Sequence, residues 1–134
     1  MYVVLPISCE CTFIQLQQII HVVFARMMPP LVLGSVVATL TWTFLARVQG
    51  PDLGVWLLAL ASLALVVAAA LTRAINIPIN SQLMTWSTEA PPSHLREVWT
   101  RWEKVHSIRT ALAVAAFGLE GIALSAFAQG SLLH

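Results

Sequence analysis

Charged residues divide this chain into long apolar stretches. No Asp, Glu, Lys or Arg occurs in residues 27–46 or in residues 53–72, and each stretch holds 20 residues. A helix rises about 1.5 Å per residue, so each stretch can extend about 30 Å, the thickness of the hydrocarbon core of a bilayer. The pattern therefore predicts two membrane-spanning helices. The second is the clearer, because its eight Leu and Val side chains between residues 57 and 71 together favour insertion by roughly 2.5–5 kcal/mol.

The first stretch contains a proline pair near its start, at Pro29 and Pro30. Proline is tolerated in the first turn of a helix and kinks a helix further along. Two alternatives follow: the helix begins at this pair, or a longer helix that begins near Thr12 bends there. Residues 12–25 are apolar but too few to span a membrane, so they favour an interfacial or re-entrant helix.

A third apolar stretch runs from about Thr110 to Leu132 and contains one acid, Glu120. An acid at that depth costs about 2.5–3.5 kcal/mol, so Glu120 should face the interior of the bundle. Two interpretations of this residue stay open. It is either a protonated carboxyl that bonds a neighbouring helix, or a functional group.

The composition agrees with a membrane protein. Hydrophobic residues make up 58% of the chain and charged residues only 10%, whereas soluble domains carry about 25% charged residues. The net charge of +1 leaves no basic surface for nucleic acid. We therefore predict an all-α protein, a transmembrane helical bundle with three spans that forms a single membrane domain over residues 1–134.

The segment between spans two and three, residues 73–109, differs from the rest. It holds five of the seven basic residues and three of the five tryptophans. Segments rich in Lys and Arg stay on the cytoplasmic side of a membrane. We therefore expect this segment to form an extramembrane turn and helix in the cytoplasm, together with the N-terminus.

Pro78 lies near the start of that segment, between Asn76 and Asn80. A proline disfavours helical conformation in the residue before it, so we expect the helix of span two to end here. The amides of Asn76 and Asn80 then either satisfy free carbonyls at the helix end or contact a substrate.

A further helix is expected to begin after Pro91 and Pro92, with Ser93 as its N-cap, and to continue unbroken into span three. Spacings of three and four residues place six of its side chains on one stripe: Leu95, Trp99, Trp102, His106, Arg109 and Ala113. The tryptophans can act as interface anchors, and Arg109 can extend to lipid headgroups. We favour a functional role for His106, because a neighbouring cation lowers the pKa of a histidine and keeps it a neutral base.

Several motifs resemble the anthrone oxygenase family, small membrane proteins of fungal polyketide pathways that are also widespread in bacteria. These motifs are Asn76-x-Pro78-x-Asn80, Trp86, Trp99-x-x-Trp102-x-x-x-His106-x-x-Arg109-Thr110, Ala115-Ala116-Phe117 and, upstream, Gln18-Ile19-Ile20-His21, Phe24 and Met28-Pro29-Pro30. The resemblance covers roughly residues 13–128. Family members typically have four transmembrane helices. Too few residues precede Phe13 to form the first of them, so we expect this chain to lack it.

The resemblance implies a cofactor-independent oxygenase that converts an anthrone, such as emodin anthrone, to the anthraquinone with O2 in secondary metabolism. The substrate supplies all the electrons, so no flavin, haem or metal is formally required. We expect His106 to be the catalytic base and Arg109 to stabilise the enolate oxygen. The expected substrate-binding residues are Asn76, Asn80, Trp86, Trp99, Trp102 and His21, with the tryptophans of the stripe stacking on the polycycle.

A second interpretation is a non-catalytic membrane scaffold or subunit that docks soluble pathway enzymes through the charged residues of segment 73–109. It needs no base, and the tryptophans are then interface anchors. A transporter subunit is less favoured, because three spans are too few without assembly into a homo-oligomer. The spacing of His21, His94, His106 and Glu120 matches no metal-binding motif, so no metal site is predicted.

Overall fold

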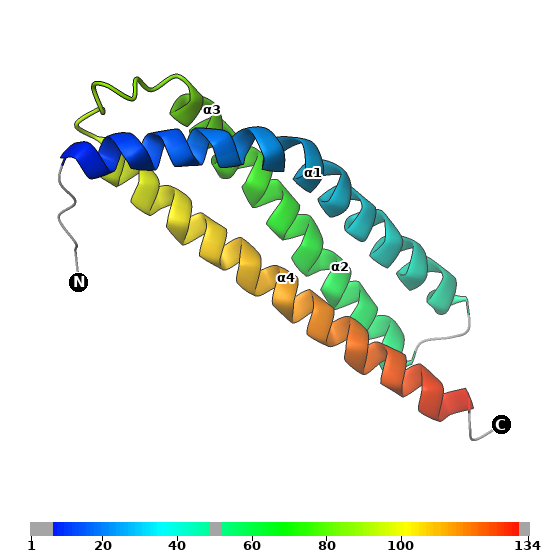
Figure 1. The fold of residues 1–134 in the computed structure, drawn as a ribbon. Helices are drawn as coiled ribbons and strands as arrows, with labels where there is room; N and C mark the ends of the chain where they lie inside the picture. Colours follow the sequence, from blue (N-terminus) through cyan, green and yellow to red (C-terminus); the bar gives the residue numbers. More distant parts are fainter. Residues whose placement is uncertain (1–6, 49–51, 132–134) are drawn as a thin grey trace.

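A computed structural model describes residues 7–48 and 52–131. Most of these residues are helical, residues 85–94 form a loop, and none of them lies in a strand. In chain order the elements are α1 (Ile7–Arg47), α2 (Leu53–Leu71), the π-helical turn η1 (Thr72–Asn76), α3 (Ile77–Met84) and α4 (Leu95–Ser131). In Figure 1 the long helices lie side by side, and α2 packs against both α1 and α4. The predicted all-α helical bundle is confirmed.

Three of the described helices are long and apolar enough to cross a membrane: Glu10–Arg47, Leu53–Met84 and Leu95–Gln129. Many large apolar side chains point away from the bundle, among them Phe44, Trp56 and Phe117, which are 67%, 69% and 77% exposed. Apolar surface of this extent is typical of contact with lipid rather than water. The chain is therefore a membrane protein with three candidate spans. The predicted end of the third span at Leu132 falls outside the described residues.

Helix α1 runs without a break through Pro29 and Pro30. Of the two alternatives, the long bent helix is the one observed, and it begins at Ile7 rather than near Thr12. Proline lacks the backbone N–H and its ring clashes with the preceding turn, which explains the change of direction along α1 from blue to cyan in Figure 1. The bend directs the N-terminal half of α1 across α3 and the first turns of α4.

The predicted helix end at Pro78 is wrong. The helical backbone continues from α2 through η1 into α3, and Pro78 lies in the first turn of α3. The π turn just before Pro78 locally widens the helix, and this gives the proline ring room that a regular α-helix would not leave. Of the two alternatives for the asparagines, the capping role is not observed. Asn76 makes no capping bond, and Asn80 bonds an indole instead.

Helix α4 is unbroken from Leu95 to Ser131, as predicted. Its N-cap is His94 rather than Ser93, because the His94 carbonyl accepts the first helical bond, from the Val98 N–H at 3.2 Å. Six charged residues lie in positions 95–109. A hydrocarbon core does not accommodate that many charges. We therefore propose that this part of α4 lies outside the core and that the apolar part, from about Thr110 onward, lies inside it.

Polar side chains connect the three long helices inside the apolar bundle. The Thr39 hydroxyl of α1 donates to Oε1 of Glu120 in α4 at 2.6 Å. One turn along α1, the Thr43 hydroxyl lies 3.0 Å from the Ser62 hydroxyl of α2. Glu120 therefore faces the bundle and bonds a neighbouring helix. Hydrogen bonds of this kind fix which faces of membrane helices meet.

Candidate functional site

Three parallel rings form an aromatic column on α4, made of Trp99, Trp102 and His106. The Trp99 and Trp102 rings are stacked with centroids 4.5 Å apart and planes inclined by 13°. The Trp102 and His106 rings are stacked with centroids 4.6 Å apart and planes inclined by 8°. Steps of three and four residues place side chains one above another on a helix, so the stripe in the sequence becomes a stack. Phe13 of α1 meets Trp99 in a T-shaped contact at 4.8 Å.

Arg109 bonds the histidine at the end of the aromatic column. Its Nη2 lies 2.7 Å from Nδ1 of His106, and its Nη1 donates to the Thr72 hydroxyl at 3.4 Å. A guanidinium has only donors, so Nδ1 accepts and the proton of a neutral imidazole lies on Nε2. Burial, and after it the charge of Arg109, lower the pKa of His106. Both causes favour the same neutral form.

The two asparagines lie one turn apart but in different environments. Oδ1 of Asn80 accepts from Nε1 of Trp102 at 2.8 Å, which ties the middle of the aromatic column to α3. Asn76 belongs to the same η1 turn as Thr72, the partner of Arg109. It is only 1% exposed, and neither polar atom of its amide has a partner among the described residues. A buried amide without a partner costs about 1–3 kcal/mol, so Asn76 has the capacity to bond a water or a substrate oxygen.

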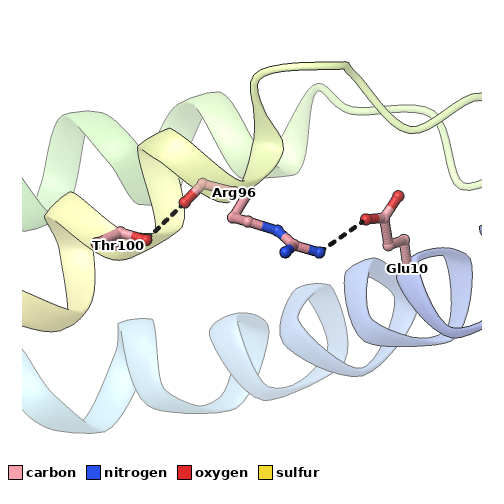
Figure 2. Close-up of polar contacts among 3 residues, drawn as sticks. All are labelled: Glu10, Arg96 and Thr100. Carbon is pink, nitrogen blue, oxygen red and sulfur yellow. Dashed lines mark hydrogen bonds and ion pairs between the residues drawn. The ribbon is translucent and has the colours of Figure 1, made fainter. Parts of the chain in front are cut away.

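The N-terminal half of α1 is attached to the loop that follows α3. Nε2 of Gln18 donates to the carbonyls of Leu83 and Trp86, each at 3.1 Å. Farther toward the N-terminus, Nη2 of Arg96 in α4 lies 4.0 Å from Oε1 of Glu10 (Figure 2). An exposed ion pair contributes about 0–1 kcal/mol. Gln18 therefore makes the more specific attachment of α1 to this region.

Two of the predicted site residues lie apart from the aromatic column. The Trp86 ring meets the His94 ring in a T-shaped contact at 6.0 Å. His21 is half-buried and makes no hydrogen bond or ring contact within the part of the chain that the structure describes. Five of the eight predicted residues are joined by direct contacts: Trp99, Trp102, His106, Arg109 and Asn80.

A shallow hollow of about 620 Å³ opens on α4 next to His106. It is lined by His106, Ser107, Thr110, Ala111, Val114 and Ala115. The small side chains on the turns after His106 leave the space open, and these turns belong to the apolar part of the helix. A flat apolar molecule dissolved in the bilayer can therefore approach His106 from this side.

Sequence reasoning predicted no contact for Thr72, Glu103 or Gln18, although Gln18 belongs to the motif Gln18-Ile19-Ile20-His21. Oε1 of Glu103 accepts from Nε1 of Trp99 at 2.9 Å, and its position four residues after Trp99 could have indicated this. The contacts of Thr72 and Gln18 cross between helices, and no local spacing reveals them. Among the described residues, no group of three or more His, Cys, Asp or Glu side chains could hold a metal ion.

In a comparison with known protein families, the anthrone oxygenase family matches residues 17–119 of the chain. The chain belongs to the anthrone oxygenase family. The matched residues include the aromatic column, Arg109 and both asparagines, so the motifs on which the resemblance rests lie inside the family region. No curated protein and no solved structure matches the chain.

Proposed function

We propose that this member of the anthrone oxygenase family oxidises an anthrone-type aromatic polyketide to the anthraquinone with O2, without a cofactor. The observation that supports it most directly is the bonded pair of His106 and Arg109 at the edge of a hollow on the apolar part of α4. A neutral imidazole and a guanidinium are the two groups that enolisation of a ketone requires, one as base and one as partner of the developing oxyanion.

The overall reaction needs no external electrons. An anthrone and O2 give an anthraquinone and water. The anthrone methylene lies between two aromatic rings and opposite a carbonyl, so a modest base can remove its proton. The resulting electron-rich enolate reacts with O2 at that carbon, and the hydroperoxide formed there loses water to become the second carbonyl.

The hydrogen bond between Arg109 and His106 sets the order of the first steps. Nδ1 of His106 already accepts from Arg109, so it cannot take a proton until the guanidinium moves. A substrate oxygen that gains negative charge is a stronger acceptor for Arg109 than a neutral imidazole nitrogen. Arg109 then turns to the substrate oxygen, and the released Nδ1 accepts the methylene proton. The two residues act as a coupled pair.

The aromatic column has a positioning role in this scheme. Trp102 is stacked on Trp99 with one face and on His106 with the other. Neither face of its indole is therefore open to a substrate. We therefore assign Trp102 to holding His106 and to stabilising the imidazolium that forms, through its π face. Asn76, Trp86 and His21 remain the proposed contacts for substrate oxygens and rings, and Trp99 keeps that role only at its outer edge.

Turnover under 18O2 tests the proposal. Membranes that contain the chain are supplied with an anthrone and compared with membranes without it, with His106→Ala, and with Lys104→Ala as a matched exposed control. We expect 18O in the new carbonyl above the background of air oxidation. A base role predicts that His106→Ala loses about 10²–10⁴ in kcat, whereas a binding role predicts a raised KM with kcat retained. Equal label in all samples, with the chain shown to be inserted, contradicts the proposal.

The charged segment supports the scaffold as a second candidate. Arg96, Arg101 and Lys104 are exposed on α4, and their exposed charges fit a docking surface for a soluble pathway enzyme. If the chain is a scaffold, charge reversal at these three positions should abolish the co-purification of a soluble pathway enzyme with the membrane. His106→Ala should leave that co-purification unchanged. Enzyme recovery that is unaffected by charge reversal contradicts the scaffold.

A further inference from the structure

The two indoles of the aromatic column donate to chemically different acceptors. Nε1 of Trp102 donates to the amide oxygen of Asn80 at 2.8 Å. Nε1 of Trp99 donates to the carboxylate of Glu103 at 2.9 Å. A carboxylate can take a proton from its partner and an amide oxygen cannot hold one near neutral pH. Of the two indoles, only that of Trp99 therefore donates to a group that can take its proton.

The stacking gives continuous contact between π systems from His106 to Trp99. Both pairs of planes are within 13° of parallel, and neighbouring centroids are at most 4.6 Å apart. Indole loses an electron much more easily than the benzene ring of phenylalanine, and electrons exchange readily between rings in direct contact. Phe13, which meets Trp99 at the far end, is much harder to oxidise and ends the series.

We propose that Trp102 and Trp99 form a one-electron relay that carries an oxidising equivalent from the neighbourhood of His106 to Trp99, where Glu103 takes the indole proton. The proposal rests on the proposed function only for the source of the oxidant. The substrate enolate passes one electron to O2, which becomes superoxide, and the substrate radical that remains combines with a second O2 to form an organic peroxyl radical. Such a species next to the base would otherwise oxidise His106 or the substrate unselectively.

The electrons and protons balance in each step. The peroxyl radical takes one electron from Trp102 and becomes a peroxide anion, which leaves an indole radical cation. Trp99 returns an electron to Trp102 and becomes the radical cation. Its Nε1 proton then moves to Glu103, which gives a neutral tryptophanyl radical and a carboxylic acid. A soluble thiolate supplies one electron, becoming a thiyl radical, and the proton returns from Glu103 to Nε1.

The different acceptors give the relay its direction. A radical cation on Trp102 cannot lose its proton to Asn80, so the charge moves on. A radical cation on Trp99 is trapped when Glu103 takes its proton. Trp99 is the ring farther from His106 and its bond to Glu103 is exposed, so a soluble reductant can reach the trapped radical.

A tethered photo-oxidant tests the relay without any anthrone. A ruthenium polypyridyl complex is attached in the hollow through Ala111→Cys, with Cys9 and Cys11 changed to Ser, and is oxidised by a laser flash in the presence of an electron acceptor. Transient absorption distinguishes an indole radical cation from the neutral radical. We expect the neutral radical to form. Trp99→Phe or Trp102→Phe, each of which keeps an aromatic ring of similar shape, should abolish it, and Glu103→Gln should leave a longer-lived cation.

Two variants serve as matched controls. Trp56→Phe removes an exposed indole at the start of α2, and Glu97→Gln removes an exposed carboxylate on the first turn of α4. Both should leave the transient unchanged. A neutral radical that persists in Trp99→Phe and Trp102→Phe, or that forms equally fast in Glu103→Gln, overturns the relay. Because no anthrone is present, a normal transient in a chain that fails to oxidise anthrone rejects the proposed function alone.

Discussion

Nε1 of Trp102 donates to Oδ1 of Asn80 at 2.8 Å, and this bond joins the centre of the aromatic column to α3. The contact spans 22 positions in the chain and connects α4 to the helix that continues from α2. His106 stacks directly on the ring that this bond holds. The orientation of the candidate base therefore depends on an amide in a different helix.

Removal of the Asn80 amide should destabilise the protein and loosen the column. Asn80→Leu leaves the Trp102 N–H without an acceptor in a half-buried place, and we expect a loss of about 1–3 kcal/mol. The measurement is unfolding of the detergent-solubilised protein by denaturant. In the double variant with Trp102→Phe the donor is absent, so the loss should be smaller than the sum of the two single losses. Additive losses would show that the bond contributes nothing. Gln82→Leu, an exposed change on α3, is the control.

The pH dependence of turnover should follow the neutral form of His106. Burial and Arg109 both lower its pKa, so the active neutral form persists to lower pH than in an ordinary histidine, whose pKa is about 6.5. The acid limb of kcat/KM should therefore lie below that value. Arg109→Gln removes the charge but not the burial, so the pKa rises and the limb moves to higher pH, along with a loss of rate. Arg101→Gln, at an exposed position, should leave the limb in place. If the acid limb of kcat/KM lies at the same pH in Arg109→Gln as in the parent, His106 is not the titrating group.

The sequence predicted the helical class, the number of candidate spans and the long helix α4 because these depend on local quantities. Runs without charge reveal the spans, and steps of three and four residues reveal the stripe that becomes the column. Pro78 was misinterpreted because its effect on a helix depends on the turn before it, and a π turn has no simple sequence pattern. The partner of Asn80 and the isolation of Asn76 could not be predicted, because both depend on how α3 and η1 pack against α4.

The bond between Thr39 and Glu120 should contribute modestly to stability. The Thr39 hydroxyl has one hydrogen and two acceptors in reach, Glu120 at 2.6 Å and the Ser35 carbonyl at 2.9 Å. A glutamine side chain keeps a carbonyl oxygen that can accept the Thr39 hydrogen and adds an N–H that can donate to the hydroxyl. Glu120→Gln should therefore be as stable as the parent, and Thr39→Val should lose about 0.6–1.7 kcal/mol. Both are measured by unfolding in mixed micelles. A marked loss in Glu120→Gln would indicate that the carboxylate itself is required.

The close approach of α2 and α4 at Gly54 gives a last prediction with an internal control. A Cβ at this position would lie 2.6 Å from Cζ of Phe127, so Gly54→Ala forces the ring to move. Overpacking of this kind costs about 1–3 kcal/mol, less if the end of the ring can shift. Gly118→Ala meets no heavy atom within 4 Å and should gain up to about 1 kcal/mol from helix propensity alone. The same substitution should therefore lower the free energy of unfolding at Gly54 and raise it at Gly118. The measurement is the free energy of unfolding of each variant. A gain in stability at both positions would show that the Phe127 ring moves aside without a loss of packing energy.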